Sequence, residues 1–99
     1  MQAVNIVIVS HYEDSRGDAD FEAKSVDQYD SSNPMFTSLS QGVISFFESR
    51  GYCLDAGGDD TTAEWDIADP NPFECQSKAE NAANAVLRAL ERKLVQFKV

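Results

Sequence analysis

Residues 3–12 read AVNIVIVSHY, and this stretch decides the fold class. Valine and isoleucine, which favour strands, dominate it, and apolar side chains occupy both alternating sets of positions. A strand that is apolar on both faces is typical of the centre of a sheet, or of a strand whose outer face is covered. We therefore expect a sheet that has residues 3–12 near its middle.

The segment after this strand predicts its partner. Residues 13–18, EDSRGD, are polar and contain Gly17, which adopts positive φ without steric cost. In residues 19–27, Phe21 and Ala23 alternate with acidic and basic side chains, as in a strand with one apolar face. The two strands and the short turn predict a hairpin.

A helix is predicted over residues 34–50. Asn33 suits the N-cap, Pro34 suits the first helical position, and apolar residues then recur with helical spacing. Gly51 is typical of a helix end. A glycine within a helix costs about 1 kcal/mol relative to alanine. We therefore expect Gly42 to mark a close contact with a strand.

The second half of the chain predicts another hairpin. Residues 52–55 and 61–68 have strand character, and the segment AGGD between them predicts a turn at Gly57 and Gly58. The Trp65 side chain is expected on the same face as Ile67.

The C-terminal segment predicts a second helix. Ser77 and Glu80 form a capping-box pattern, and an apolar stripe follows as far as Leu94. Two alternatives stay open for residues 95–99, VQFKV. Their alternation favours a strand, and the lack of a preceding Gly or Pro favours a continued helix.

The predicted elements follow the order β-β-α-β-β-α. This order indicates one α+β domain over residues 1–99, with an antiparallel sheet of about four strands and both helices on one face. Aromatic residues make up 10% of the chain, too many for a disordered acidic tail. The longest apolar run, residues 6–9, is too short for a membrane span, and no leader pattern is visible. A cytoplasmic location is expected.

Charge is distributed unevenly along the chain. Seventeen acids and eight bases give a net charge of −9. Residues 1–74 hold fifteen acids and three bases, a balance of −12, whereas residues 75–99 hold two acids and five bases, a balance of +3. An acidic field repels nucleic acid and anionic membranes and attracts basic protein surfaces. Direct nucleic-acid binding and membrane binding are therefore not expected, although acidic surfaces also keep small proteins soluble.

Catalytic and cofactor signatures are absent from the sequence. It contains no P-loop, dinucleotide-binding, H-E-x-x-H or C-x-x-C pattern. His11 is the single histidine, and Cys53 and Cys75 are the only cysteines, which we expect to be reduced thiols. An EF-hand alignment begun at Asp14 puts Arg16 at a ligand position. We expect no metal, no cofactor and no enzymatic activity.

Acidic residues gather at the predicted turns and strand ends. Turns favour aspartate, but this preference does not account for four acids at one turn. Spaced carboxylates imitate the charge repeat of a nucleic-acid backbone, and Tyr12, Tyr29 and Trp65 lie beside them as candidate anchors. The candidate partner-binding residues are Tyr12, Glu13, Asp14, Asp18, Asp20, Asp27, Tyr29, Asp30, Asp55, Asp59, Asp60, Asp66 and Asp69.

In size, in its acidic segments EDSRGDAD and DAGGDD and in its ββα arrangement, the chain resembles the small acidic inhibitors made by phages, such as anti-CRISPR proteins and DNA mimics. The resemblance implies a protein that occupies a basic nucleic-acid-binding surface of a bacterial defence complex, in the host cytoplasm if a phage encodes the chain. The resemblance concerns the general character of the whole chain and includes no shared motif. It therefore assigns no function to any single residue. Two alternatives stay open: an assembly module that dimerises through Val7 and Val9, and a small metal-dependent enzyme.

Overall fold

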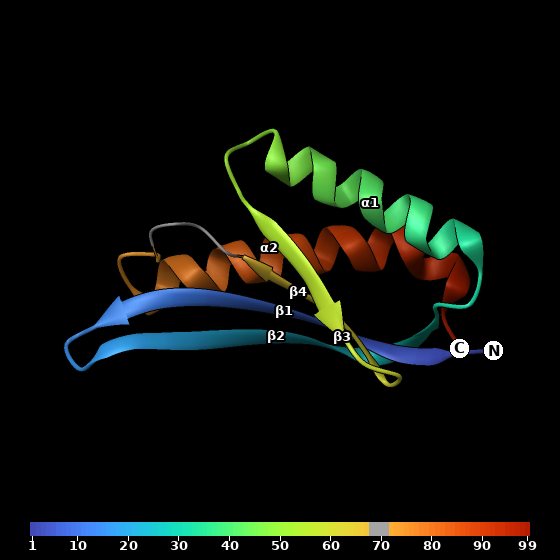
Figure 1. The fold of residues 1–99 in the computed structure, drawn as a ribbon, viewed down its shortest axis with the longest axis horizontal. Coiled ribbons are helices and arrows are strands. Elements are labelled where there is room, and N and C mark those ends of the chain that lie inside the picture. The colour runs from blue at the N-terminus through green and yellow to red at the C-terminus, as the bar shows by residue number, and fades with distance from the viewer. Residues whose placement is uncertain (68–71) are drawn as a thin grey trace.

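The computed structural model describes residues 1–67 and 72–99. Within these residues the chain forms a sheet with two helices on one of its faces (Figure 1). This arrangement confirms the predicted α+β class and the element order. The elements are β1 (Ala3–Asp14), β2 (Gly17–Asp30), α1 (Pro34–Glu48), β3 (Leu54–Gly58), β4 (Thr62–Ile67), α2 (Gln76–Leu94) and the short 3₁₀ helix η1 (Val95–Phe97).

The sheet has the strand order β2-β1-β4-β3 and is mixed. Each hairpin is antiparallel, as predicted, but β1 and β4 pair in parallel, with Val7 opposite Glu64 and Val9 opposite Asp66. The prediction of an entirely antiparallel sheet is therefore wrong at this one pairing. The reason lies in α1, which runs back along the molecule after β2, so that β3 repeats the direction of β2 and β4 repeats that of β1 (Figure 1).

The core lies between the sheet and the helices. Ile6 and Ile8 of β1 are fully buried, as are Leu90 and Leu94 of α2. Within this apolar layer the Ser10 hydroxyl donates a 2.8 Å hydrogen bond to the backbone carbonyl of Ala79, which satisfies both buried polar groups. The position of β1 at the centre of the sheet follows from its two apolar faces, as predicted.

A bulge interrupts the long edge strand β2. Asn5 pairs with Gln28 and Val7 with Lys24, so residues 25–27 lie opposite a single residue of β1. The Ser25 hydroxyl accepts a 2.9 Å hydrogen bond from the Ile6 amide and donates another to the Asp27 carbonyl. A side chain thus completes the backbone ladder where the extra residues break it.

The second hairpin turns later than predicted. Gly57 and Gly58 belong to β3, and the chain reverses after them. The Asp59 carboxylate accepts hydrogen bonds of 2.9 Å from both the backbone amide and the hydroxyl of Thr61. Aspartate stabilises a turn in this way, and the prediction that the glycines form the turn overlooked it.

Two further local predictions are corrected, and the alternatives for residues 95–99 are resolved. Helix α2 begins at Gln76 after Cys75, whose side chain makes no capping hydrogen bond, so the predicted Ser77 cap is wrong. Apart from the neighbouring residues of α1 itself, no atom lies within 4 Å of the position that a Cβ atom would take at Gly42, so this glycine does not contact a strand. Residues 95–97 form η1, and Lys98 then makes an isolated bridge to Tyr29.

Within the described residues, no helix combines the length and the apolar character needed to cross a membrane.

Candidate functional site

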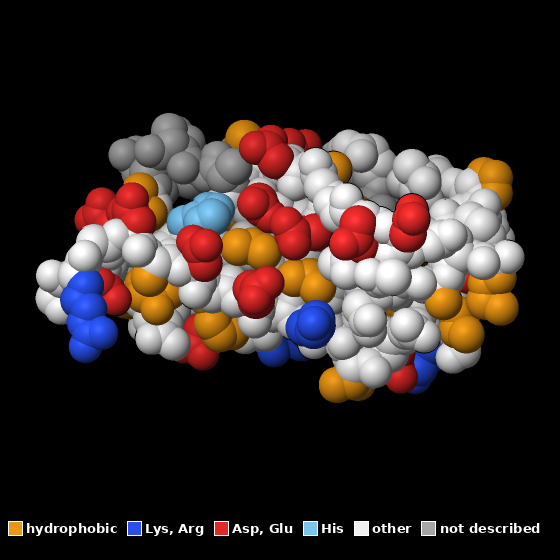
Figure 2. All heavy atoms as spheres, turned by 60° about the horizontal axis from the view of Figure 1, so that its bottom comes forward, with side chains coloured by type: hydrophobic (Ala, Val, Ile, Leu, Met, Phe, Trp, Pro, Cys, Tyr) orange, Lys and Arg blue, Asp and Glu red, His pale blue; other side chains and the backbone are white. Residues whose placement is uncertain are grey.

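The face of the sheet that points away from the helices is strongly acidic (Figure 2). The pairing register of the strands aligns the side chains of this face in rows that run across the sheet. In one row Glu22, Val9, Asp66 and Asp55 follow one another across all four strands. We call this surface the acidic face and define it by its seven carboxylates, Glu13, Asp18, Asp20, Glu22, Asp55, Glu64 and Asp66.

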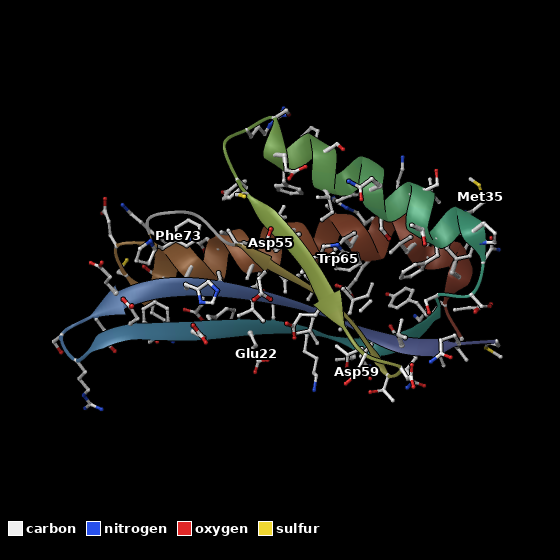
Figure 3. The ribbon with its side chains drawn as sticks, in the orientation of Figure 1. Glu22, Met35, Asp55, Asp59, Trp65 and Phe73 are labelled. Carbon is white, nitrogen blue, oxygen red and sulfur yellow. The ribbon has the colours of Figure 1, made fainter. Side chains whose placement is uncertain are left out.

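Lys24 is the one lysine or arginine that the strand register places on the acidic face within the described residues. It lies on β2 beside Val7, and Glu64 lies on the other side of Val7. Figure 3 shows Glu22 pointing away from the helices. Same-face neighbours lie about 4.8 Å apart between strands and about 6.6 Å apart along a strand. The face therefore carries carboxylates at close, regular spacing.

The apolar side chains of the acidic face are covered. Val7 is 3% exposed and Val9 is 8% exposed, although neither faces the helices. Val7 lies between Lys24 and Glu64, and Val9 lies between Glu22 and Asp66. The aliphatic stem of a lysine or glutamate covers an apolar neighbour of this kind. The face therefore presents carboxylates to the solvent in place of an apolar patch. The dimer alternative requires free valine side chains, and the structure gives it no support.

His11 lies among the acids at the β1 position opposite Asp20. Its Nδ1 atom is 2.6 Å from Asp20 Oδ1, and its Nε2 atom is 4.0 Å from Asp66 Oδ2. The imidazole thus lies between a carboxylate of β2 and a carboxylate of β4. The described part of the chain contains no group of three or more acidic, histidine or cysteine side chains arranged to hold a metal ion. The site is a charged surface, and the structure gives the metal-enzyme alternative no support.

Neighbouring acids affect the protonation of Glu64. Its pKa is raised, first by the hydrogen bond that it shares with Asp66, then by burial, and then by the negative charges of Asp66, Glu22 and Asp59. Acids of β2, of β4 and of the second turn therefore all act on one carboxyl group. Glu64 therefore shares its electrostatic environment with two other acids of the acidic face, Asp66 and Glu22.

The two hairpin turns extend the acidic surface. At the first, Asp14 accepts a 2.7 Å hydrogen bond from the Arg16 amide and is itself exposed. At the second, hydrogen bonds to Thr61 lower the pKa of Asp59, and Asp60 beside it is exposed. These acids, which were predicted from the sequence, serve the turns and remain open to the solvent.

Other candidate residues lie away from the acidic face. Tyr29 is only 2% exposed, and Trp65 is 8% exposed within the core, so neither is an exposed anchor. Tyr12 occupies a β1 position that alternates with the acidic face, where it pairs with Ala19 and bridges to Phe73. Tyr29 and Trp65 belong to the buried core, and Tyr12 is half-buried on the opposite side of β1 from the acidic face, so none of the three is part of that face.

Two further predicted aspartates, Asp27 and Asp30, also lie elsewhere. Asp27 forms a 3.1 Å ion pair with Lys98. Asp30 accepts hydrogen bonds from Ser32 and from the Gln2 amide, which lower its pKa. Asp69 lies outside the described residues.

Sequence reasoning missed Glu22, Glu64 and His11 as members of this surface. The alternation of residues 19–27 already placed Glu22 on the same strand face as Asp20, so this signal was sufficient to find it. Glu64 joins the face only because β4 pairs with β1, and no local pattern shows that pairing.

Comparisons with protein-family models, with curated proteins and with solved structures find no match to this chain. The assignment of function therefore depends on the chemistry of the surface.

Proposed function

We propose that this protein is a non-catalytic inhibitor that binds a basic, nucleic-acid-binding surface of a bacterial defence complex of the CRISPR type. The acidic face and the two acidic turns occupy that surface and block access of DNA or RNA to it. The single observation that supports this proposal is the gathering of seven carboxylates and one lysine on one open sheet face.

The energetics of the acidic face favour a role in binding. Like charges at this spacing repel one another, so their gathering opposes folding. The pKa of Glu64 is raised, first through its hydrogen-bonding interaction with Asp66, then by burial and by the negative charges of its neighbours. A basic partner surface removes the repulsion and replaces it with charge-assisted hydrogen bonds to carboxylates. The free energy that the isolated chain loses to repulsion is thereby recovered on binding.

The geometry of the acidic face resembles that of a nucleic-acid backbone in its charge density. Duplex DNA carries one charge about every 3.4 Å along each strand. The carboxylates of the acidic face lie at spacings of the same order, set by the pleat and by the distance between strands. A site that binds phosphates through lysine and arginine would therefore find comparable acceptors on this surface, and association would be fast and sensitive to salt.

The test uses a variant with four neutral substitutions at the centre of the acidic face: Asp20→Asn, Glu22→Gln, Glu64→Gln and Asp66→Asn. The parent protein is used to capture partners from a bacterial lysate, and the affinity of each recovered nucleic-acid-binding protein is then measured at low and high salt. We expect the variant to bind at least tenfold more weakly, which is about 1.4 kcal/mol, and duplex DNA to compete with the parent.

The matched control removes four acids from the helix side and from the segment before α2: Glu48→Gln, Glu74→Gln, Glu80→Gln and Glu91→Gln. It has the same net charge as the test variant and leaves the acidic face unchanged, so it should keep most of the affinity. Equal losses in the two variants would mean that only net charge matters. Unchanged affinity in the test variant, without competition by DNA, would refute the proposal.

A further inference from the structure

A groove runs between α1 and α2 on the side of the molecule opposite the acidic face. Its volume is about 520 Å³, and its lining residues are Gly42, Val43, Phe46, Ala89, Arg92 and Lys93. The two helices run in opposite directions along it (Figure 1). Gly42 has open space where a side chain would lie, and Ala89 faces it with a single methyl group. Small residues therefore make this groove hollow.

The wall of the groove exposes an aromatic side chain. Phe46 is 51% exposed, and the Arg50 guanidinium lies 3.8 Å from the centre of its ring. The neighbouring Phe47 is buried and meets Phe46 edge to face, with ring centres 5.4 Å apart. The Phe46 ring is thus held in place by a core residue and by a cation while much of it stays in water. Rigid aromatic side chains and arginines of this kind are enriched in protein interfaces.

The surface of α1 beside the groove is free of charge. From Pro34 to Phe47 the helix carries no charged residue, and Glu48 is its only one, whereas charged residues make up 25% of the whole chain. The exposed positions in this stretch hold residues such as Thr37, Gln41 and Ser45. Depletion of charge is the compositional mark of the centre of a protein interface. A small ligand inside the groove would not require it, because such a ligand leaves the outer surface of α1 in water.

The rim of the groove is basic. Arg92 and Lys93 line it from α2, and Arg50 adds a third cation at the Phe46 ring. The net charge of the chain is −9, so this cluster is a local inversion of the overall field. The acidic face lies on the far side of the sheet, and charges further away than about 8 Å are largely screened at physiological salt. The cations at the rim of the groove therefore dominate the electrostatic interaction with an acidic partner at this site.

We infer that the α1–α2 groove binds an acidic amphipathic helix of a partner protein. The apolar residues of that helix lie over Gly42 and Val43 and against Phe46, and its acidic residues meet Arg92 and Lys93. This is the helix-in-groove mode of recognition, in which apolar anchors recur at helical spacing. The acidic face binds basic partners, so the two sides of the molecule select partners of opposite charge.

The probe is a synthetic amphipathic peptide about five turns long, with leucine along one stripe and glutamate and alanine elsewhere. Its counterpart has lysine in place of every glutamate. Binding to the full chain is followed by fluorescence anisotropy at physiological salt, and the contact residues are mapped from backbone amide shifts. We expect the glutamate peptide to bind at least tenfold more tightly than the lysine peptide, with shifts centred on Gly42, Phe46 and Ala89.

Two variants and a matched control test whether the peptide binds in the α1–α2 groove. Arg92→Glu with Lys93→Glu, or Gly42→Leu alone, should each weaken the glutamate peptide at least tenfold. Gly42→Leu fills open space, and circular dichroism checks that it folds. Arg16→Glu with Lys24→Glu makes the same change in net charge away from the groove and should leave the affinity within twofold of the parent.

Three results would overturn the inference. The first is equal or tighter binding of the lysine peptide. The second is a set of amide shifts that avoids the groove. The third is full displacement of the glutamate peptide by laurate, with the same amide shifts, which would assign the groove to a small anionic amphiphile.

Discussion

Glu64 and Asp66 lie two residues apart on β4, so their carboxyl groups share one face of the sheet, where Asp66 raises the pKa of Glu64. Two carboxyl groups form a hydrogen bond only when one of them holds a proton, so the proximity of Asp66 favours the protonated form of Glu64. The raised pKa of Glu64 follows from this pairing, and it makes the stability of the fold depend on pH.

We predict that Glu64→Gln stabilises the protein at neutral pH. Because the pKa of Glu64 is raised in the folded state above its ordinary value of 4.5, the folded chain binds this proton more strongly than the unfolded chain. Glu64 therefore opposes folding above its raised pKa, and this penalty disappears as the pH falls towards 4.5. Urea unfolding of parent and variant should give curves that converge as the pH falls; parallel curves would contradict the prediction.

Gly42 and Gly58 should respond to alanine in opposite directions. Gly42 has helical neighbours and open space around it, so Gly42→Ala should stabilise the fold by about 1 kcal/mol. Gly58 has a φ of +113°, and a Cβ atom there would overlap the Thr62 carbonyl oxygen, so Gly58→Ala should destabilise by more than that amount. Thermal unfolding of the two variants measures both effects. Changes in stability of the same sign would contradict the backbone geometry described at Gly42 or at Gly58.

Ser25→Ala should cost about 1–3 kcal/mol. The substitution removes the acceptor of the Ile6 amide and the donor to the Asp27 carbonyl, and Ser25 is only 5% exposed. A backbone group left unpaired in a buried place costs its full desolvation. Ser45→Ala, on the exposed surface of α1, is the matched control and should change the free energy of unfolding by less than about 0.5 kcal/mol. If Ser25→Ala and Ser45→Ala changed the free energy of unfolding equally in urea melts, the hydrogen bonds of Ser25 would not stabilise the bulge.

Cys75 should react faster with a thiol reagent than Cys53. Both are free and exposed. The pKa of Cys75 is lowered, first by a hydrogen bond with the Ser77 hydroxyl 3.2 Å away and then by the Lys78 amide at the start of α2. The measurement is the reaction rate with Ellman's reagent near pH 7 for Cys53→Ser and Cys75→Ser separately. Ser77→Ala should slow the reaction of Cys75, and an unchanged rate would remove the assigned cause.

Patterns local to the sequence were sufficient for much of the fold. The two apolar faces of residues 3–12 predicted the central strand, and the Asn33-Pro34 pair with the following apolar spacing predicted α1. These features succeed because a strand or helix is set by neighbours two to four positions apart. The acidic character of the surface was also evident, because charge is a property of composition.

The acidic face itself was decided only by tertiary structure. Glu64 and Asp66 reach Val7 and Val9 because α1 reverses the chain and lets β4 pair in parallel with β1, a contact between segments more than fifty residues apart. The same packing buries Tyr29 and Trp65, which the sequence placed beside the acids as anchors. Alternation shows that a strand has two faces, but the choice of the buried face depends on which elements pack against it. Composition therefore determined the sign of the charge, and the topology of the sheet decided where it gathers.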